Sequence, residues 1–537
     1  MTTTKSNIFF IILFVVMTTI FVACDNHLEH EVSEIEVPEV PTETVSFTED
    51  ELLVLMQMRN PDNRICIDEA TEIAIDAISF FNAGNTTRSG EIRRVANIAA
   101  LRGEPTTRMT TRASDERVEV KMPDTLAYVF NFADDAGFAI IAADTRIESP
   151  ILAFVEDGSL DLSKEIDHPG LAIFLSGAEE YIERSIIESE QRRDSLLADI
   201  LTKIEVVGVM DTVYLDDAAT RRGDSEWRTG ETTTISGGPW ITDSRMGPLS
   251  TVEWGQSFPY NDLVKSKKCT NPSSYLPFTS CDLVVPTGCV ATATAMLMAY
   301  WGEPAQIDGY NMDWGLLNEY TGGNSNVHEN IWGKLVIPTT LPARLSGRQV
   351  LFSNNVSRLM ERIGHHVGMN YGCSKHGGSG IANMQKMVNF LHKMGYTGGC
   401  EENYNTRVVI NSLNNRHPVL ASGFRDRTLF VPHTGHTWLI DGYLRQRQQI
   451  MITVTITDVA QGPAGPFLRT RTMITTETVY SSYYLHNNWG WNGSYNGFFV
   501  AGSFHVGDEF GSNARSVPME DRNYQYKNKI FPNIKLK

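Results

Sequence analysis

The sequence predicts an α+β protein, in which helices and strands come from separate stretches of the chain. An uncharged, Ala-rich run at residues 289–301 is typical of a buried helix. Residues 436–441 place their side chains alternately on two faces, as a strand does. The front of the chain has helical and alternating segments of its own. With 537 residues, of which 42% are hydrophobic and 20% charged, the chain is ordinary globular material for two or three domains.

Residues 1–23 have the features of a lipoprotein signal peptide. Lys5 precedes an apolar run that is short for a membrane span, and a small residue stands before Cys24. We expect Cys24 to carry lipid, which predicts a bacterial lipoprotein of the cell envelope, at the outer membrane or cell surface, with release after processing as a further outcome. Because Phe21 is unusual in a lipid-attachment motif, an ordinary signal peptide cut nearby is the alternative. Residues 24–50, acidic and punctuated by Pro, have the composition of a tether.

Residues 51–235 are predicted to form an α+β domain. Apolar residues recur at helical spacing in 67–81, and residues 171–201 form a long, charged helical segment. Residues 125–132 and 137–143 alternate like two strands across an Asp-Asp-Ala-Gly turn. The Thr- and Arg-rich stretch at 86–117 predicts a loop between helix and hairpin.

Charge separates the front of the chain from the rest. The formal charge is −25 for residues 25–240 and +6 for residues 241–537. We therefore expect electrostatic attraction between the two parts. A solvated acidic face, the usual explanation of a charge run, is the alternative.

The junction at residues 216–244 has no periodicity and is rich in Thr, Ser and Gly. It contains Arg221-Arg222-Gly223, which suits an exposed and cleavable linker. Processing is therefore predicted there, ahead of a second large domain at residues 236–537.

Cys289 begins the Ala-rich helix directly after a Thr-Gly turn. Unpaired backbone N–H groups and the positive end of the helix dipole stabilise a thiolate at such a position. Cys289 is therefore a candidate nucleophile. The plain alternative is a small, buried apolar residue.

A cysteine nucleophile needs a histidine to accept its proton, and His436 is the candidate. It begins a strand in which it shares a face with Trp438 and Ile440. It follows Cys289 by 147 residues (436 − 289), a spacing within that of papain-like cysteine proteases. A third segment at residues 487–493, NNWGWNG, offers amides and two indoles that could orient and shield the imidazole.

Four motifs stand in the order found in the streptopain family of bacterial cysteine proteases. They are WGQSFPYN at 254–261, TGCVATATA at 287–295, GHTWLIDG at 435–442 and NWGWNG at 488–493. MNYG at 369–372 and HPVLASG at 417–423 are similar to its connecting segments. The chain therefore resembles this family over about residues 250–500, since four ordered motifs match by chance far less often than one.

The resemblance implies a role for each matching residue. The four are the nucleophile Cys289, the general acid/base His436, the oxyanion donor Gln256 and the indole beside the histidine, Trp489. Asn487 and Asn488 are candidates for orienting the histidine. Papain-like proteases generally use an asparagine two residues before a Trp-Gly, where streptopain-like motifs usually lack one.

The same resemblance implies a papain-like two-lobed protease, with a central helix in one lobe and a β-barrel-like second lobe. It also implies a zymogen whose front domain is an inhibitory propeptide; an accessory binding domain that stays attached is the alternative. The expected activity is hydrolysis of protein or peptide substrates through a thioester, under reducing conditions and with no cofactor.

The remaining segments of the second domain are predicted more coarsely. Helices are expected at 353–367 and 381–395, a Gly-rich loop at 373–380, and strands of the barrel-like lobe at 451–458 and 472–485. After residue 499 the chain departs from the streptopain pattern, because SFHVGDEFGSNARSVPMEDR replaces a very Gly-rich loop. The substrate preference of the family is therefore not carried over.

The seven cysteines do not predict a disulfide framework. Cys269 with Cys281, or Cys373 with Cys400, could pair in an oxidising envelope, and free thiols are the alternative. The histidines lack metal-ligand spacing, and the acidic balance argues against a nucleic-acid partner.

Two other functions remain open at this point. A catalytically silent surface lipoprotein could bind a partner protein, but the four intact site residues argue against it. Acyl transfer to amines, as in transglutaminases, could use the same Cys-His chemistry, but no second-substrate site is evident.

Overall fold

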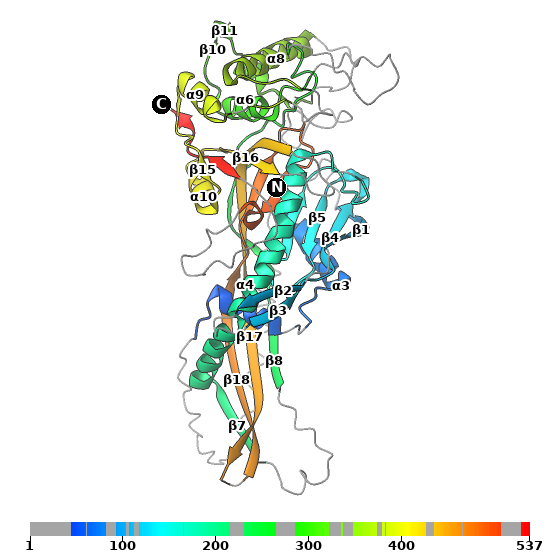
Figure 1. Cartoon of the computed structure of the whole chain (residues 1–537), viewed down its shortest axis with the longest axis vertical. Coiled ribbons are helices and arrows are strands. Elements are labelled where there is room, and N and C mark those ends of the chain that lie inside the picture. Colours follow the sequence, from blue (N-terminus) through cyan, green and yellow to red (C-terminus); the bar gives the residue numbers. More distant parts are fainter. Residues whose placement is uncertain are drawn as a thin grey trace, which may run out of the picture. The chain divides into compact units, whose positions relative to one another are not determined.

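The computed structural model describes most of the chain after residue 44 (Figure 1). The described residues are 45–58, 60, 62–81, 93–103, 107–111, 117–164, 166–214, 230–264, 285–321, 335–336, 347–372, 379–381, 383–425, 434–463, 465–505 and 528–537. The predicted signal peptide, Cys24 and most of the tether lie outside them, as do the loop residues 373–378. Within the described ranges, no helix is both long and apolar enough to cross a membrane.

Residues 45–537 form one compact unit, because the front part shares a sheet with the rest of the chain. The elements of the front part are α2 (Glu49–Met58), α3 (Ile67–Phe81), β1 (Val95–Arg102), β2 (Thr107–Thr111), β3 (Arg117–Lys121), β4 (Thr125–Phe132), η1 (Ala133–Asp135), β5 (Phe138–Ala142), β6 (Ile151–Val155), α4 (Pro169–Val207) and β7 (Val209–Tyr214). The domain boundary near residue 235 stays a prediction.

Most of the front part follows its sequence pattern. The helix at 67–81 and the two strands at 125–132 and 137–143 are confirmed, and β4 pairs with β5. The loop predicted at 86–117 is wrong, because β1 and β2 lie within it. β1 is an edge strand whose residues are all half-buried or exposed, so it lacks the alternation that marks a strand in sequence.

The second part contributes the helices around Cys289 and most of the strands. Its elements are β8 (Gly230–Gly237), β9 (Ile241–Met246), α6 (Cys289–Trp301), β10 (Gln306–Ile307), β11 (Tyr310–Asn311), α7 (Trp314–Leu317), β12 (Tyr320–Thr321), β13 (Leu335–Val336), α8 (Gly347–Val367), α9 (Gln385–Lys393), β14 (Tyr396–Thr397), β15 (Glu402–Asn403), α10 (Thr406–Asn414), β16 (Val419–Arg425), β17 (Thr434–Gly462), β18 (Gly465–Tyr480), β19 (Tyr484–Asn488), β20 (Gly497–Val500), η3 (Ala501–Phe504), β21 (Lys529–Phe531) and β22 (Lys535–Leu536). The helices predicted at 353–367 and 381–395 correspond to α8 and α9.

A 14-stranded antiparallel sheet runs through both parts. Its main order is β1-β4-β5-β6-β20-β19-β17-β16-β21-β15. The two parts join where β6 pairs with β20, with Phe154 opposite Phe498. The strand order of the described residues has two ends, and the papain-like lobes, one of them barrel-like, stay a prediction.

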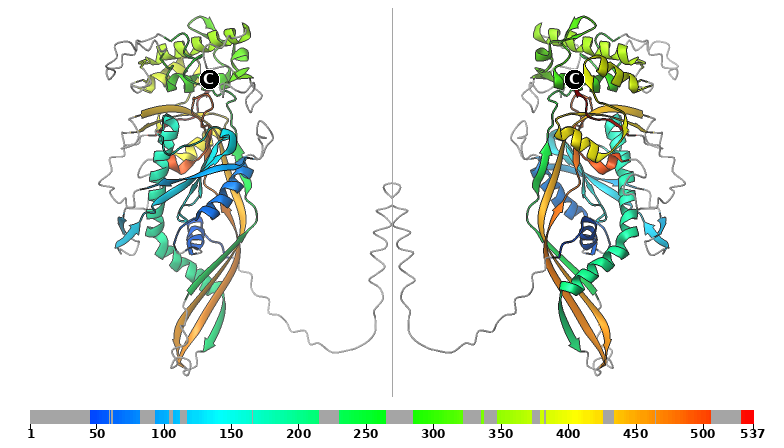
Figure 2. Two further views of the ribbon diagram at one scale, coloured as in Figure 1. Left: turned by 90° about the vertical axis from the view of Figure 1, so that its right-hand side faces the viewer. Right: turned by 90° about the vertical axis from the view of Figure 1, so that its left-hand side faces the viewer.

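The longest feature of the sheet is the hairpin of β17 and β18. The sequence predicts strands at 451–458 and 472–485, whereas β17 spans 29 residues and β18 ends at Tyr480. Their pairing runs from Arg447 opposite Tyr480 to Gly462 opposite Gly465. The hairpin extends away from α6, α8 and α9, with part of α4 alongside it (Figures 1 and 2).

Three apolar cores hold the unit together. The first lies between the sheet and helices α3 and α4, and it includes residues from both parts of the chain. The second surrounds α6, whose residues 290–299 are all buried, which explains why this helix is uncharged on every side. The third lies along the hairpin, between β17, α2 and α4. Cys289 therefore stands at the end of a helix that is fixed by packing on all sides.

Candidate active site

Cys289 is the first residue of α6, as predicted. The turn before it depends on Gly288, whose φ of 89° favours glycine. A Cβ at Gly288 would lie 2.8 Å from Met369 Sδ and 3.0 Å from the Ser379 carbonyl oxygen. Ser379 Oγ in turn donates to the Pro286 carbonyl at 2.7 Å. These contacts fix the sulfur at the first turn of the helix, where backbone N–H groups are unpaired.

The environment of the Cys289 thiol favours its protonated form. Burial raises its pKa, and hydrogen bonds from Thr437 and from the backbone at the start of α6 oppose this shift only in part. The β17 residue that bonds the thiol is thus Thr437, the neighbour of the predicted histidine.

His436 lies on β17 opposite Gly423 of β16, and its side chain is buried. Its ring stacks on Trp438 at a centroid distance of 6.3 Å. Its Nε2 donates to the Trp489 carbonyl oxygen at 2.8 Å. Burial lowers the pKa of His436 to about 4, so the imidazole is neutral.

Because neighbouring residues of a strand face opposite sides, Thr437 faces α6 while His436 faces the core shared with the front part. The structure therefore brings both predicted residues to one end of β17 but does not join them as a Cys-His pair.

Two residues of the front part fill the space beside His436. His168 caps the N-terminus of α4 by accepting from the Leu171 N–H at 3.0 Å. Its ring lies 6.4 Å from that of His436 and 5.2 Å from that of Trp491. Burial, with His436 close by, holds the pKa of His168 well below its ordinary value. The start of α4 thus covers the face of β17 on which His436 lies.

Gly170 packs directly against the Trp489 indole. A Cβ at Gly170 would lie 2.3 Å from Trp489 Cε3, so only glycine allows α4 to approach this closely. The sequence analysis missed His168 and Gly170. The signal available was a His-Pro-Gly turn before a long helix, which indicates a helix start but not what it contacts.

The backbone around Gln256 is bonded to the start of α6. The Thr287 N–H donates to the Gln256 carbonyl at 3.0 Å, and Thr292 Oγ1 lies 3.4 Å from the Gly255 carbonyl. Gln256 itself is half-buried. The predicted oxyanion donor is therefore anchored beside Cys289 through its main chain.

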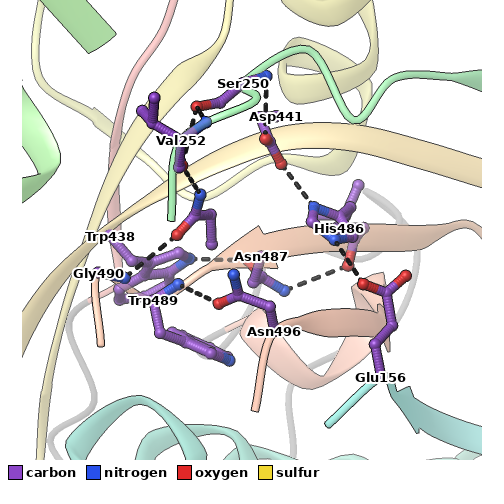
Figure 3. Close-up of polar contacts among 12 residues, drawn as sticks. Glu156, Ser250, Val252, Trp438, Asp441, His486, Asn487, Trp489, Gly490 and Asn496 are labelled. Carbon is purple, nitrogen blue, oxygen red and sulfur yellow. Dashed lines mark hydrogen bonds and ion pairs between the residues drawn. The ribbon is translucent and has the colours of Figure 1, made fainter. Parts of the chain in front are cut away.

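Trp489 is fully buried beside His436, with ring centroids 6.3 Å apart. Its indole Nε1 donates to the Tyr495 carbonyl at 2.9 Å. Its backbone N–H donates to Asn496 Oδ1 at 3.0 Å (Figure 3). These bonds fix the indole beside His436, and its role in the active site stays a prediction.

The two candidate orienting asparagines have other partners in this state (Figure 3). Asn487 Oδ1 accepts from Trp438 Nε1 at 2.8 Å. Asn488 Nδ2 donates to the Val252 carbonyl at 2.8 Å. Asn487 thus holds the indole on which His436 stacks, and a direct role for either amide stays a prediction.

A buried ionic network lies behind the site and was not predicted (Figure 3). His486 Nδ1 lies 2.6 Å from Asp441 Oδ1, and its Nε2 lies 3.7 Å from Glu156 Oε2 of the front part. Burial alone would lower the pKa of His486, but the two carboxylates raise it to about 10. Asp441 also accepts from the Ser250 N–H at 3.2 Å. The Asp of the GHTWLIDG motif therefore stabilises the sheet and, through His486, the contact with the front part.

Three of the cysteines are free thiols, namely the half-buried Cys289 and the exposed Cys66 and Cys400. The other four lie outside the described residues. The pairing of Cys269 with Cys281 stays a prediction, and Cys400 is unpaired in this structure.

Comparison with protein families identifies both parts of the chain. The model of the peptidase C10 family matches residues 254–499, and that of the Spi protease inhibitor matches residues 62–182. No curated protein matches the chain. The first match contains Cys289 and His436, and the second contains His168 and Gly170. Residues 254–499 are thus a peptidase C10 (streptopain) family domain preceded by a Spi protease inhibitor domain, the arrangement of a streptopain-like protease zymogen.

Proposed function

We propose that the chain is a cysteine endopeptidase in which Cys289 is the nucleophile and His436 the general acid/base. The observation that carries this proposal is the convergence of three segments on the start of α6. Cys289 begins the helix, the backbone of Gln256 is bonded to its first turn, and Thr437, the residue after His436, bonds the thiol.

In the active state the His436 imidazole turns toward Cys289 and takes the thiol proton. The thiolate attacks the scissile carbonyl carbon, and the oxyanion accepts from the Cys289 N–H and the Gln256 amide. His436 then protonates the leaving amine, which departs and leaves a thioester. Water attacks the thioester, His436 takes a proton from it, and the carboxylic acid product leaves as the thiol is restored.

In the zymogen the start of α4 keeps His436 in its neutral, inactive orientation. His168 lies beside its ring and Gly170 packs on Trp489, so a substrate peptide cannot occupy this face. The inhibitor-like part of the chain is therefore an inhibitory propeptide, and activation requires that α4 leave the site.

Outside the described residues, Cys24 remains the proposed lipid-attachment site, which anchors the zymogen to the cell envelope. Cleavage at residues 216–229, between β7 and β8, remains the proposed processing step. The rest of the predicted linker is wrong, because residues 230–237 and 241–246 form β8 and β9, which pair with β17.

The Gln256→Ala variant is expected to lose catalytic rate with little change in substrate binding. An oxyanion donor acts mainly in the transition state, and its loss costs roughly 10²–10³ in kcat. Steady-state kinetics on a fluorogenic peptide would measure this after propeptide removal. A rise in KM at constant kcat would instead show that Gln256 only binds substrate.

The Asn487→Ala variant tests whether this amide orients His436 in the active enzyme. We expect a lower kcat and an altered pH profile, since a misplaced imidazole holds its proton less well. Full activity with an unchanged pH profile would show that Asn487 does not orient His436 and that its role is limited to the hydrogen bond from Trp438.

Acid is expected to weaken the contact between propeptide and protease. His436 has a pKa of about 4 when covered and regains an ordinary value near 6.5 when released. The released state therefore binds more protons, and the stabilisation present above about pH 6.5 is lost as the pH falls toward 4. From pH 7.5 to 5.5, His436 alone accounts for about tenfold weaker binding, and His168 adds to it.

Gel filtration of the Cys289→Ala chain, cut by an added protease between β7 and β8, would measure this release at the two pH values. His168→Asn keeps a capping side chain but cannot titrate, so it should reduce the pH dependence. Equal dissociation constants of the two fragments at both pH values, measured over a dilution series, would contradict the prediction.

A further inference from the structure

The propeptide makes a second contact with the protease, away from Cys289. It lies on the distal hairpin, which is the part of β17 and β18 at residues 447–480. On one face of β17, residues at every second position are buried, and they meet α4 residues one helical turn apart. These side chains are Ile450, Ile452, Val454 and Ile456 from β17 and Ile200 and Ile204 from α4. The spacing of two on the strand and four on the helix gives each element one apolar face toward the other.

Backbone pairing extends this contact along one edge of the hairpin. β7 pairs with β18 from Val209 opposite Thr472 to Tyr214 opposite Phe467. The other edge of the hairpin is occupied by β8, which pairs with β17. Cleavage between β7 and β8 would therefore leave β7 hydrogen-bonded to the protease.

Two ion pairs join acidic side chains of the front part to arginines of the rest of the chain, as the formal charges of the two parts predict. Arg445 of β17 lies 3.4 Å from Glu49 of α2. Arg471 of β18, which is almost fully buried, is bonded to Glu205 of α4. The Phe47 N–H donates to Glu477 Oε1 at 3.1 Å. Glu49 and Glu205 of the propeptide thus meet arginines of β17 and β18, while Glu477 of β18 accepts from a backbone N–H of the propeptide.

None of these propeptide residues lies in the segment that matches the Spi protease inhibitor, residues 62–182. That segment supplies His168 and Gly170 at the site. The hairpin contact is made by α2, by the C-terminal part of α4 and by β7, on both sides of the match.

We propose that the distal hairpin is a separate docking surface for the propeptide, which keeps it bound and the site covered after the connecting chain is cut. This inference rests on the proposed zymogen function and adds a second step to its regulation. A single cut in the linker does not activate the enzyme, because α2, α4 and β7 stay on the hairpin. Activation then requires that the hairpin contact be broken or the propeptide degraded.

The test uses the full chain with Cys289→Ala and a recognition sequence for a site-specific protease inserted between Arg222 and Gly223. After complete cleavage, gel filtration should show both fragments eluting together, even on dilution to nanomolar concentration. Ile204→Asp should weaken retention at least about 100-fold, because it places a carboxylate in the apolar contact. Val206→Asp is the matched control, since Val206 is 72% exposed on the same helix, and its fragments should stay together.

A second variant guards against a folding defect in Ile204→Asp. Glu205 has a half-exposed side chain, so Glu205→Arg should fold normally and weaken retention roughly tenfold by placing two arginines together. Cooperative thermal unfolding of each uncut chain would confirm folding. Separation of the fragments in the background chain, or equal retention in Ile204→Asp and Val206→Asp, would overturn the proposal. Because the assay uses an inactive site and an added protease, its failure is distinct from a failure of the proposed peptidase activity.

Discussion

Replacing Cys289 by alanine is expected to abolish peptidase activity, with a loss of at least about 10⁴-fold in kcat after propeptide removal. The sulfur forms and breaks the bond to the substrate carbonyl, and no neighbouring side chain can replace it. The fold should be unaffected, because α6 is held by the buried residues 290–299. A fluorogenic peptide assay under reducing conditions would measure the loss, with thermal unfolding as the check on folding.

The matched control is Cys400→Ala, which removes an exposed free thiol from the peptidase part of the chain. It should retain wild-type activity once the propeptide is removed. Residual activity above about 1% in Cys289→Ala would assign the chemistry to another nucleophile. If neither wild type nor variant hydrolyses any peptide, a binding lipoprotein would become the better interpretation.

The second large effect is expected from Gly170→Ala, which should make the uncut chain active. The added Cβ would lie 2.3 Å from Trp489 Cε3, closer than real Cβ contacts, so the start of α4 must move away from the site. Overpacking of this kind costs about 1–3 kcal/mol, which corresponds to a roughly 5- to 150-fold larger fraction of open molecules. The rate at which a thiol-directed peptidyl inhibitor labels Cys289 in the uncut chain would measure the fraction of open molecules.

Gly347→Ala is the control for this change, because a Cβ at Gly347 meets no atom within 4 Å. It should leave latency unchanged. A Gly170→Ala chain that is as latent as wild type would show that α4 does not control access to the site.

The sequence predicted those features that depend on residues close together along the chain. Cys289 begins a helix because a Thr-Gly turn and an Ala-rich run stand side by side, and His436 begins a strand because its neighbours alternate. The peptidase C10 family model supports this prediction, because its match is a single segment that contains both residues.

Other features depend on contacts between distant segments and could not be predicted. The orientation of His436 is set by the Trp489 carbonyl and by His168, which is far away in sequence. The pKa of His486 is raised because Asp441 of β17 and Glu156, the residue after β6, both approach its ring. The strand β1 was missed because its exposed residues follow no pattern, although its backbone pairs with β4.

The hairpin shows the same limit for an entire element. Its β-branched residues predict strands near 451–458 and 472–485, but no local signal gives their pairing or the length of β17. The barrel-like lobe was inferred from the family resemblance and not from a local pattern, and it stays a prediction.

The most direct test of the central claim is to map the site of a thiol-directed peptidyl inhibitor by peptide mass spectrometry, before and after removal of the propeptide. Cys66 and Cys400 are exposed free thiols and serve as internal controls in the same chain. We expect an adduct on Cys289 alone, and only after the propeptide has been removed. Equal labelling of Cys289 in the intact chain would contradict the claim that the propeptide blocks the site. No labelling of Cys289 after removal of the propeptide would contradict its assignment as the nucleophile.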